Sequence, residues 1–180
     1  MPDFEKLTEL ARECGFTHSA PLDVSTLEFK QEVRDMCKKV KCDQYGKSWS
    51  CPPACAPLEE IRGHVMGYSY GLLVQTVGEL EDSFDWEGVM KVGTHQKECF
   101  AKMWKELEKE YGEVLAMGSG SCKLCERCTY PGSPCRFPEK REVSMEACGL
   151  LVSKICADNA LKYNYGPNKT SFTSCFLFKL

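Results

Sequence analysis

The sequence lacks the features that mark membrane-spanning, exported and nucleic-acid-binding proteins. No apolar run in the 180 residues approaches the length of a membrane-spanning helix. Positive charge is not in excess, since 23 lysines and arginines stand against 26 aspartates and glutamates, which argues against nucleic-acid binding. The segment Met1 to Glu5 shows no charged region followed by an apolar run, as a signal peptide would, so we expect a cytoplasmic protein.

Motifs for nucleotide cofactors and for common catalytic chemistry are also missing. The chain has no Gly-x-Gly-x-x-Gly segment and no P-loop, so no nucleotide cofactor is indicated. Its three histidines, His18, His64 and His95, are isolated from one another and show no pairing with a nucleophile. The sequence therefore contains no recognisable substrate chemistry.

Cysteine, in contrast, is abundant, with 13 in the chain. Disulfides explain this poorly in a cytoplasmic protein, because the cytosol keeps thiols reduced. Metal ligation is the better explanation, since eight of the cysteines fall into two groups. Both groups lie in stretches rich in proline and glycine, at residues 37–57 and 118–148, where we expect metal-binding loops.

The apolar pattern outside these stretches predicts a small sheet covered by helices. We expect four strands, at residues 16–20, 68–77, 114–117 and 172–179. We expect helices at residues 4–13, 26–37, 58–65, 96–111 and 151–161. This order favours an α/β or α+β fold with about four strands, in a single domain that spans residues 1–180.

The cysteines of the second stretch have a ferredoxin-like spacing. Cys122, Cys125 and Cys128 form a C-x2-C-x2-C run, and Cys135 follows after six intervening residues. In a loop, this spacing lets three thiolates reach three irons of one cluster, and a more distant cysteine can then reach the fourth. The pattern predicts a [4Fe–4S] cluster. Cys148 is an alternative fourth ligand, and a zinc knuckle is an alternative metal site.

The first stretch holds four cysteines within 19 residues, namely Cys37, Cys42, Cys51 and Cys55. Two prolines follow Cys51, and because they lack N–H donors they can shield one side of a cluster from water. This spacing is not a standard ferredoxin run. We expect a second [4Fe–4S] cluster here, while zinc and a structural or redox role for the thiols stay open.

The cysteine motifs together resemble a cysteine-rich family of predicted metal-binding proteins of unknown function, found mainly in anaerobic bacteria and archaea. The resemblance spans nearly the whole chain and implies a bound metal and an anaerobic setting, but no reaction. This chain has Cys55-Ala56 where the family commonly has a glycine. The matching segments are Cys37-x4-Cys42, Tyr45-Gly46-x2-Trp49-x-Cys51-Pro52-Pro53, Gly120-Ser121-Cys122-x2-Cys125-x2-Cys128, Cys135-Arg136-x-Pro138-Glu139-Lys140 and Ser144-Met145-Glu146-Ala147-Cys148-Gly149.

Two four-cysteine groups without substrate chemistry predict an electron-transfer protein that exchanges single electrons with a redox protein partner. One alternative is a reductase or activase enzyme, in which one iron lacks a cysteine ligand and stays open. Another alternative is a binding module stapled by zinc. The sequence indicates neither the identity of the partner nor the oligomeric state.

Overall fold

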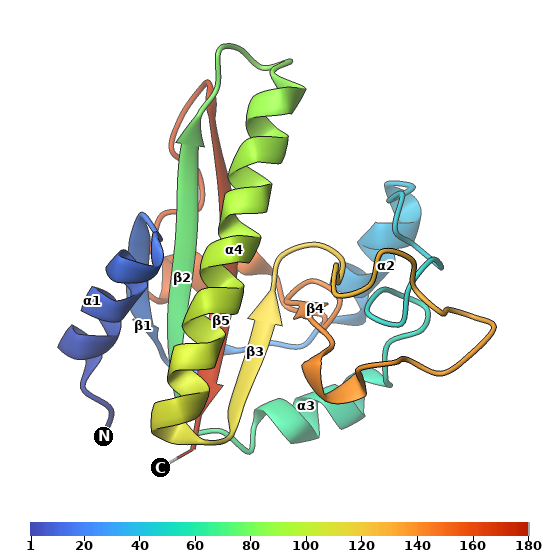
Figure 1. Cartoon of the computed structure of the whole chain (residues 1–180), viewed down its shortest axis with the longest axis horizontal. Helices are drawn as coiled ribbons and strands as arrows, with labels where there is room; N and C mark the ends of the chain where they lie inside the picture. The colour runs from blue at the N-terminus through green and yellow to red at the C-terminus, as the bar shows by residue number, and fades with distance from the viewer. Residues whose placement is uncertain (180) are drawn as a thin grey trace.

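The computed structural model describes residues 1–179 and shows one mixed five-stranded sheet (Figure 1). Its strand order is β1-β2-β5-β3-β4, and every pairing is antiparallel except that of β3 with β4. The fold is therefore α+β, as predicted, with one strand more than the four expected. The strands are β1 His18–Leu22, β2 Tyr70–Glu79, β3 Val114–Gly118, β4 Val143–Ser144 and β5 Lys169–Phe178.

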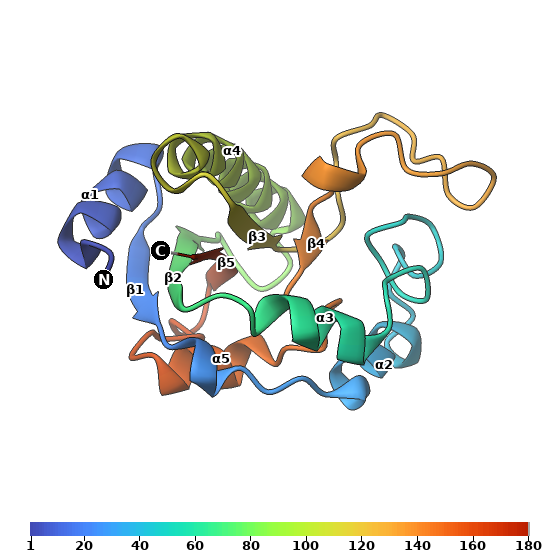
Figure 2. The same cartoon turned by 90° about the horizontal axis from the view of Figure 1, so that it is seen from below.

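Helices cover both faces of this sheet, and Figure 2 shows α1 and α4 on one side and α5 on the other. Two short 3-10 helices, at Val24–Thr26 and Pro138–Lys140, occur in the connections. The α-helices are α1 Phe4–Cys14, α2 Gln31–Lys39, α3 Leu58–Val65, α4 Trp86–Tyr111 and α5 Val152–Asp158.

The alternation of side chains along β5 divides the core into two layers. Phe176 and Phe178 face the layer beneath α1 and α4, whereas Cys175 and Leu177 face the opposite layer. All four residues are fully buried. Because successive residues of a strand point to opposite faces, this central strand supplies apolar surface to both sides of the sheet.

Helix α1 begins at the predicted residue, Phe4, and ends at Cys14, one residue beyond the predicted end. The carboxylate of Asp3 accepts a hydrogen bond from the backbone N–H of Lys6, which satisfies one free donor of the first turn. Gly15 ends the helix with a φ of 109°, a left-handed conformation that side chains with a Cβ rarely adopt.

Two helices begin well away from their predicted starts. Helix α2 begins at Gln31 instead of residue 26, because the 3-10 turn comes first and Phe29 then forms a β-bridge with Leu150. Helix α4 begins ten residues before the expected start, at Trp86, where Asp85 caps it by accepting from the N–H of Gly88. The long helix thus runs beside the sheet and past the start of the second cysteine loop.

Smaller shifts affect the strands and the last helix. Strand β1 begins two residues later than predicted, and α5 ends at Asp158 instead of residue 161. Strand β4 is the strand that the pattern did not predict, because two residues are too short for any alternation. Within residues 1–179, none of the helices combines the length and the apolar character that crossing a membrane requires.

Candidate metal centres

The two cysteine-rich loops lie side by side at one end of the sheet, as both cartoon views show (Figures 1 and 2). The first loop joins α2 to α3, and the second leaves the end of β3 and returns at β4. Cys37 lies on the last turns of α2, and neither a strand nor an α-helix occurs between Cys42 and Cys55 or between Cys122 and Cys135. Apart from Cys37, their thiols are therefore positioned by turns and side-chain contacts rather than by regular structure.

The structure brings the four cysteines of the second loop around one cavity of about 210 Å³. Cys122, Cys125, Cys128 and Cys135 all line it and are half-buried. Cys148 lies elsewhere, buried on the wall of a separate cavity together with Cys55. The spacing of the second loop thus places four thiols around a common space.

Backbone N–H groups point at one of these sulfurs. Burial alone would raise the pKa of Cys128, but hydrogen bonds from the N–H groups of Tyr130, Trp49 and Thr129 hold that pKa below its usual range. The guanidinium of Arg136 acts in the same direction. This environment favours a thiolate, the form that binds metal.

An ion pair anchors both ends of the second loop to α4. The Lys97 ammonium donates to the carbonyl oxygen of Ser121 at 2.9 Å and to the carboxylate of Glu142 at 3.0 Å. Burial raises the pKa of Glu142, while Lys97 opposes that shift. The Glu142 side chain also packs directly over Gly118, so closely that any Cβ there would collide with it. Lys97 therefore holds together the residues that enter and leave the loop.

The cysteines of the first loop differ in their exposure. Cys51 is buried, Cys37 and Cys55 are half-buried, and Cys42 is exposed. The loop is closed by a hydrogen bond from the N–H of Gly46 to the carbonyl oxygen of Pro52, at 2.8 Å. Burial raises the pKa of Cys37, and the nearby thiols of Cys42 and Cys51 raise it further. Cys51 and Cys37 likewise raise the pKa of Cys55, so each of the four thiols is close enough to at least one other to influence its charge.

Cys55, near the end of the first loop, lies close to the turn that carries Cys148. Burial raises the pKa of Cys55 to about 11, against the guanidinium groups of Arg34 and Arg141, which lower it. Burial raises the pKa of Cys148 to about 12, with a further contribution from Cys55. Arg34 is itself buried, donates from Nε to the carbonyl oxygen of Ala147 at 3.0 Å, and keeps one terminal nitrogen unpartnered within residues 1–179.

Two residues of the first loop connect it directly to the second. The Oγ atom of Ser50 accepts a hydrogen bond from the N–H of Cys122 at 3.1 Å. Trp49 donates from Nε1 to the carbonyl oxygen of Ser133 at 3.0 Å, and its ring packs edge-on against Tyr130 with centroids 5.0 Å apart. The two loops therefore form one structural unit, in which the thiol sets are neighbours.

Five cysteines lie outside both sets, and all are buried: besides Cys148, they are Cys14, Cys99, Cys156 and Cys175. Within residues 1–179, no three side chains of cysteine, histidine, aspartate or glutamate are arranged to hold a single metal ion. The thiols of the second loop instead surround a cavity.

Sequence reasoning did not identify Arg34, Lys97 or Ser50 as parts of the site. Arg34 precedes Cys37 by three residues on α2, so its place on the same helix face could have been inferred. Lys97 and Ser50 reach the second loop across long stretches of chain, and no local pattern marks such contacts.

Eight cysteines presented by two adjacent loops on an α+β sheet indicate a metal-binding protein rich in cysteine. Residues 20–178 match the family described as predicted metal-binding protein (DUF2284), and the chain belongs to this family. The resemblance inferred from the cysteine motifs is thereby confirmed. Neither a curated protein nor a solved structure was found to match the chain.

Proposed function

We propose that this protein binds two [4Fe–4S] clusters and transfers single electrons between them and a redox protein partner. One cluster would be held by Cys37, Cys42, Cys51 and Cys55, and the other by Cys122, Cys125, Cys128 and Cys135. Such clusters supply reversible one-electron chemistry at potentials set by charge, hydrogen bonds to sulfur and solvent exposure.

The observation that carries this proposal is the cavity that the four thiols of the second loop line together with residues of the first loop. Four thiols that surround a space, instead of meeting at one point, can each bind a different iron of a cubane. The N–H groups directed at Cys128 and the nearby Arg136 would stabilise the negative charge of a thiolate-bound cluster. The donor set and its surroundings therefore fit an iron–sulfur cluster.

The contacts between the loops support electron exchange between two centres. Trp49 and Ser50 belong to the first loop, yet both bond to the second, so the two thiol sets are held at a fixed separation. Electron transfer needs little else from the protein, because the redox chemistry belongs to the cofactor. The chain's own residues then serve to hold the centres and to shield them.

Metal and sulfide analysis of protein purified without oxygen tests this function directly. We expect about eight irons and about eight acid-labile sulfides per chain, and a paramagnetic signal on reduction. Stoichiometric zinc with almost no iron would contradict the clusters and support a zinc-stapled module. Binding of small ligands to the irons, seen as a changed spectrum, would instead favour an enzyme with an open iron.

The fourth ligand of the second centre can be assigned with a pair of variants. We expect Cys135→Ala to lower the iron content by about half, because Cys135 lines the cavity with the C-x2-C-x2-C run. Cys148→Ala should leave the second centre intact, since Cys148 lies beside Cys55 instead. Electron paramagnetic resonance of each variant distinguishes the two centres, and the reverse pattern would assign Cys148 as the ligand.

A further inference from the structure

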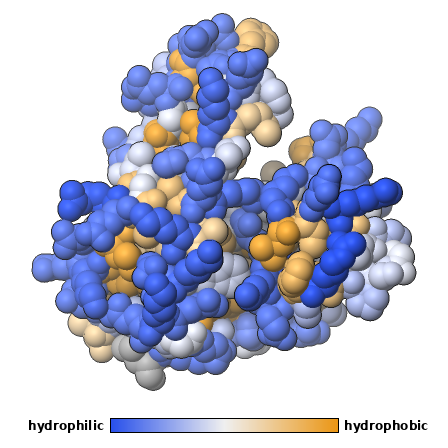
Figure 3. Space-filling view, in the orientation of Figure 1, coloured by the Kyte–Doolittle hydropathy of each residue, from blue (hydrophilic) through white to orange (hydrophobic). Residues whose placement is uncertain are grey.

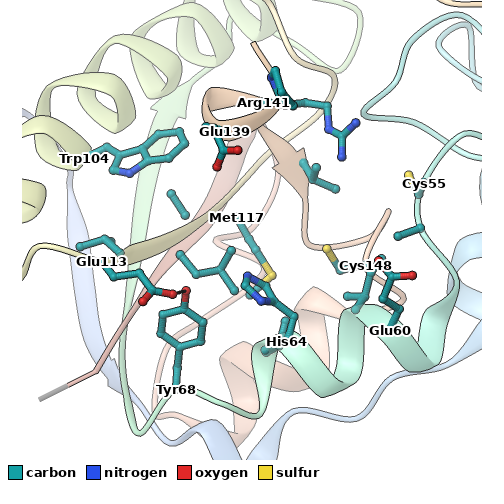
Figure 4. A pocket seen from close by; sticks show the side chains of 18 of the residues that line it. Cys55, Glu60, His64, Tyr68, Trp104, Glu113, Met117, Glu139, Arg141 and Cys148 are labelled. Atoms are coloured by element: carbon teal, nitrogen blue, oxygen red, sulfur yellow. Dashed lines mark hydrogen bonds between the residues drawn. The ribbon is translucent and has the colours of Figure 1, made fainter. Parts of the chain in front are cut away.

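A second, larger cavity of about 650 Å³ lies between the sheet and the cysteine loops. Residues of α3, α4, β3 and β4 line it, and Cys55 and Cys148 form one side (Figure 4). The space-filling view shows the surface hollowed between the part of the molecule built on α4 and the part that carries the loops (Figure 3). The volume is in the range of sites for small organic molecules.

The walls of this cavity are suited to a flat, apolar body. Val65 and Met117, both buried, form part of the lining together with the half-buried Leu115 and Val143. Aromatic rings of Trp49, Tyr68 and Trp104 complete it. Flat rings stack favourably on such aromatic surfaces, and the aliphatic side chains exclude water from the faces of a bound ring.

Two hydrogen-bond donors on the lining have no partner. The buried Nε1 of Trp104 and the buried Nε of Arg141 make no hydrogen bond within residues 1–179. Figure 4 shows both side chains directed toward the cavity, from different walls. Because a buried donor without a partner costs free energy, each requires an explanation, and an acceptor on a bound molecule would supply one.

The charges around the cavity disfavour an anion. Glu60, Glu108, Glu113 and Glu139 all line it, against one arginine. Among these four, Glu113 alone has an ion-pair partner in the described part of the chain, since its carboxylate pairs with the Lys179 ammonium at 2.9 Å. A neutral molecule can satisfy the two donors through carbonyl oxygens without meeting this repulsion.

We propose that this cavity binds a neutral, planar, conjugated organic molecule that carries carbonyl acceptors. The carbonyl oxygens would accept from Trp104 and Arg141, and the ring would lie over Met117 and Leu115. The binding site does not depend on the metal proposal, because neither donor is an expected metal ligand. Among the expected metal ligands, Cys55 lines this cavity, and Trp49 and Arg141 line the smaller cavity as well, so a molecule bound here would lie next to the first set of thiols.

Equilibrium dialysis of metal-loaded protein against lumiflavin, in the dark and without oxygen, tests the site. Lumiflavin is a neutral tricyclic ring system with two carbonyl groups. We expect saturable binding of one molecule per chain, with a dissociation constant on the order of 100 μM for a ligand of this size. 1-Naphthamide should displace lumiflavin more effectively than 1-naphthoate does, because the naphthoate carries a negative charge.

Variants of the two donors test how the molecule is held. Trp104→Phe keeps an aromatic ring but removes the N–H, so lumiflavin binding should weaken roughly fivefold. Arg141→Met should weaken lumiflavin binding by at least as much. Trp104 is unchanged in this variant, so its effect reports on the second donor alone. Trp86→Phe is the matched control, because Trp86 is 71% exposed and lies outside the cavity. The affinity of this variant for lumiflavin should equal that of the wild-type protein.

Any one of three results would overturn this inference. The first is no saturable binding of lumiflavin up to its solubility limit, and the second is wild-type affinity for lumiflavin in both donor variants. The third is stronger displacement of lumiflavin by 1-naphthoate than by 1-naphthamide. Metal analysis of the same samples separates the two proposals. Protein that carries iron and sulfide but binds no lumiflavin contradicts this inference alone, whereas protein that binds lumiflavin but holds no iron contradicts the proposed clusters alone.

Discussion

Replacing Cys125 with alanine is expected to remove about half of the iron and sulfide of the protein, leaving about four of each per chain. Cys125 is the middle cysteine of the run that lines the smaller cavity, and it has no nearby spare thiol on the second loop. Alanine cannot ligate, so one iron would lose its protein ligand. The second loop has no hydrophobic core of its own, so we expect its folded conformation to depend on the bound metal.

The first centre should survive this change, because its expected ligands come from a different stretch of chain. Iron and sulfide analysis together with the paramagnetic spectrum of the reduced protein would show one centre in place of two. Cys14→Ala is the matched control, because Cys14 is the last residue of α1 and is buried in the core, so this variant should keep the full metal content. Unchanged iron in Cys125→Ala would contradict the proposed ligand set.

Phe176→Ala is expected to produce the largest loss of stability, about 3–5 kcal/mol in the free energy of unfolding. Phe176 is fully buried on the central strand β5 and stacks on Phe100 of α4, with ring centroids 4.8 Å apart. Its removal would leave a cavity between the sheet and α4. Because that cavity lies within the packed core, neighbouring side chains can close it only in part.

Denaturant unfolding without oxygen, followed by circular dichroism, would measure this effect. Phe84→Ala is the matched control, because Phe84 is 91% exposed before α4, and its change should stay within about 0.5 kcal/mol. Equal midpoints for the two variants would contradict the assignment of Phe176 to the core. The metal content of Phe176→Ala should also be recorded, since the loops depend on the sheet for their position.

Patterns of nearby residues in the sequence predicted those parts of the fold that depend on residues close together in the chain. Helix α3 has the predicted bounds, Leu58–Val65, because Pro57 suits the start of a helix and an apolar stripe follows. The predicted start of α4 was wrong by ten residues, because Gly88, Gly93 and the exposed Met90 interrupt the apolar stripe of this helix. There the capping hydrogen bond of Asp85 and the packing on the sheet outweigh the weak pattern.

The cysteine spacing predicted which thiols belong to each loop, but not how the loops meet. Ser50 and Cys122 are 72 residues apart, and their hydrogen bond depends on the complete sheet to bring the loops together. The larger cavity likewise requires elements from four parts of the chain. Spacing rules describe contacts within one loop, whereas contacts between loops arise from tertiary structure.

The strand order has a consequence for biosynthesis. Strand β5 lies between β2 and β3, yet among the described strands it is the last to leave the ribosome. Until it emerges, the edges of β2 and β3 lack their partner, and the two cysteine loops have no common support. Unpaired strand edges of this kind favour aggregation. Delivery of iron to the nascent chain should therefore be less productive than delivery after release, when the sheet is closed.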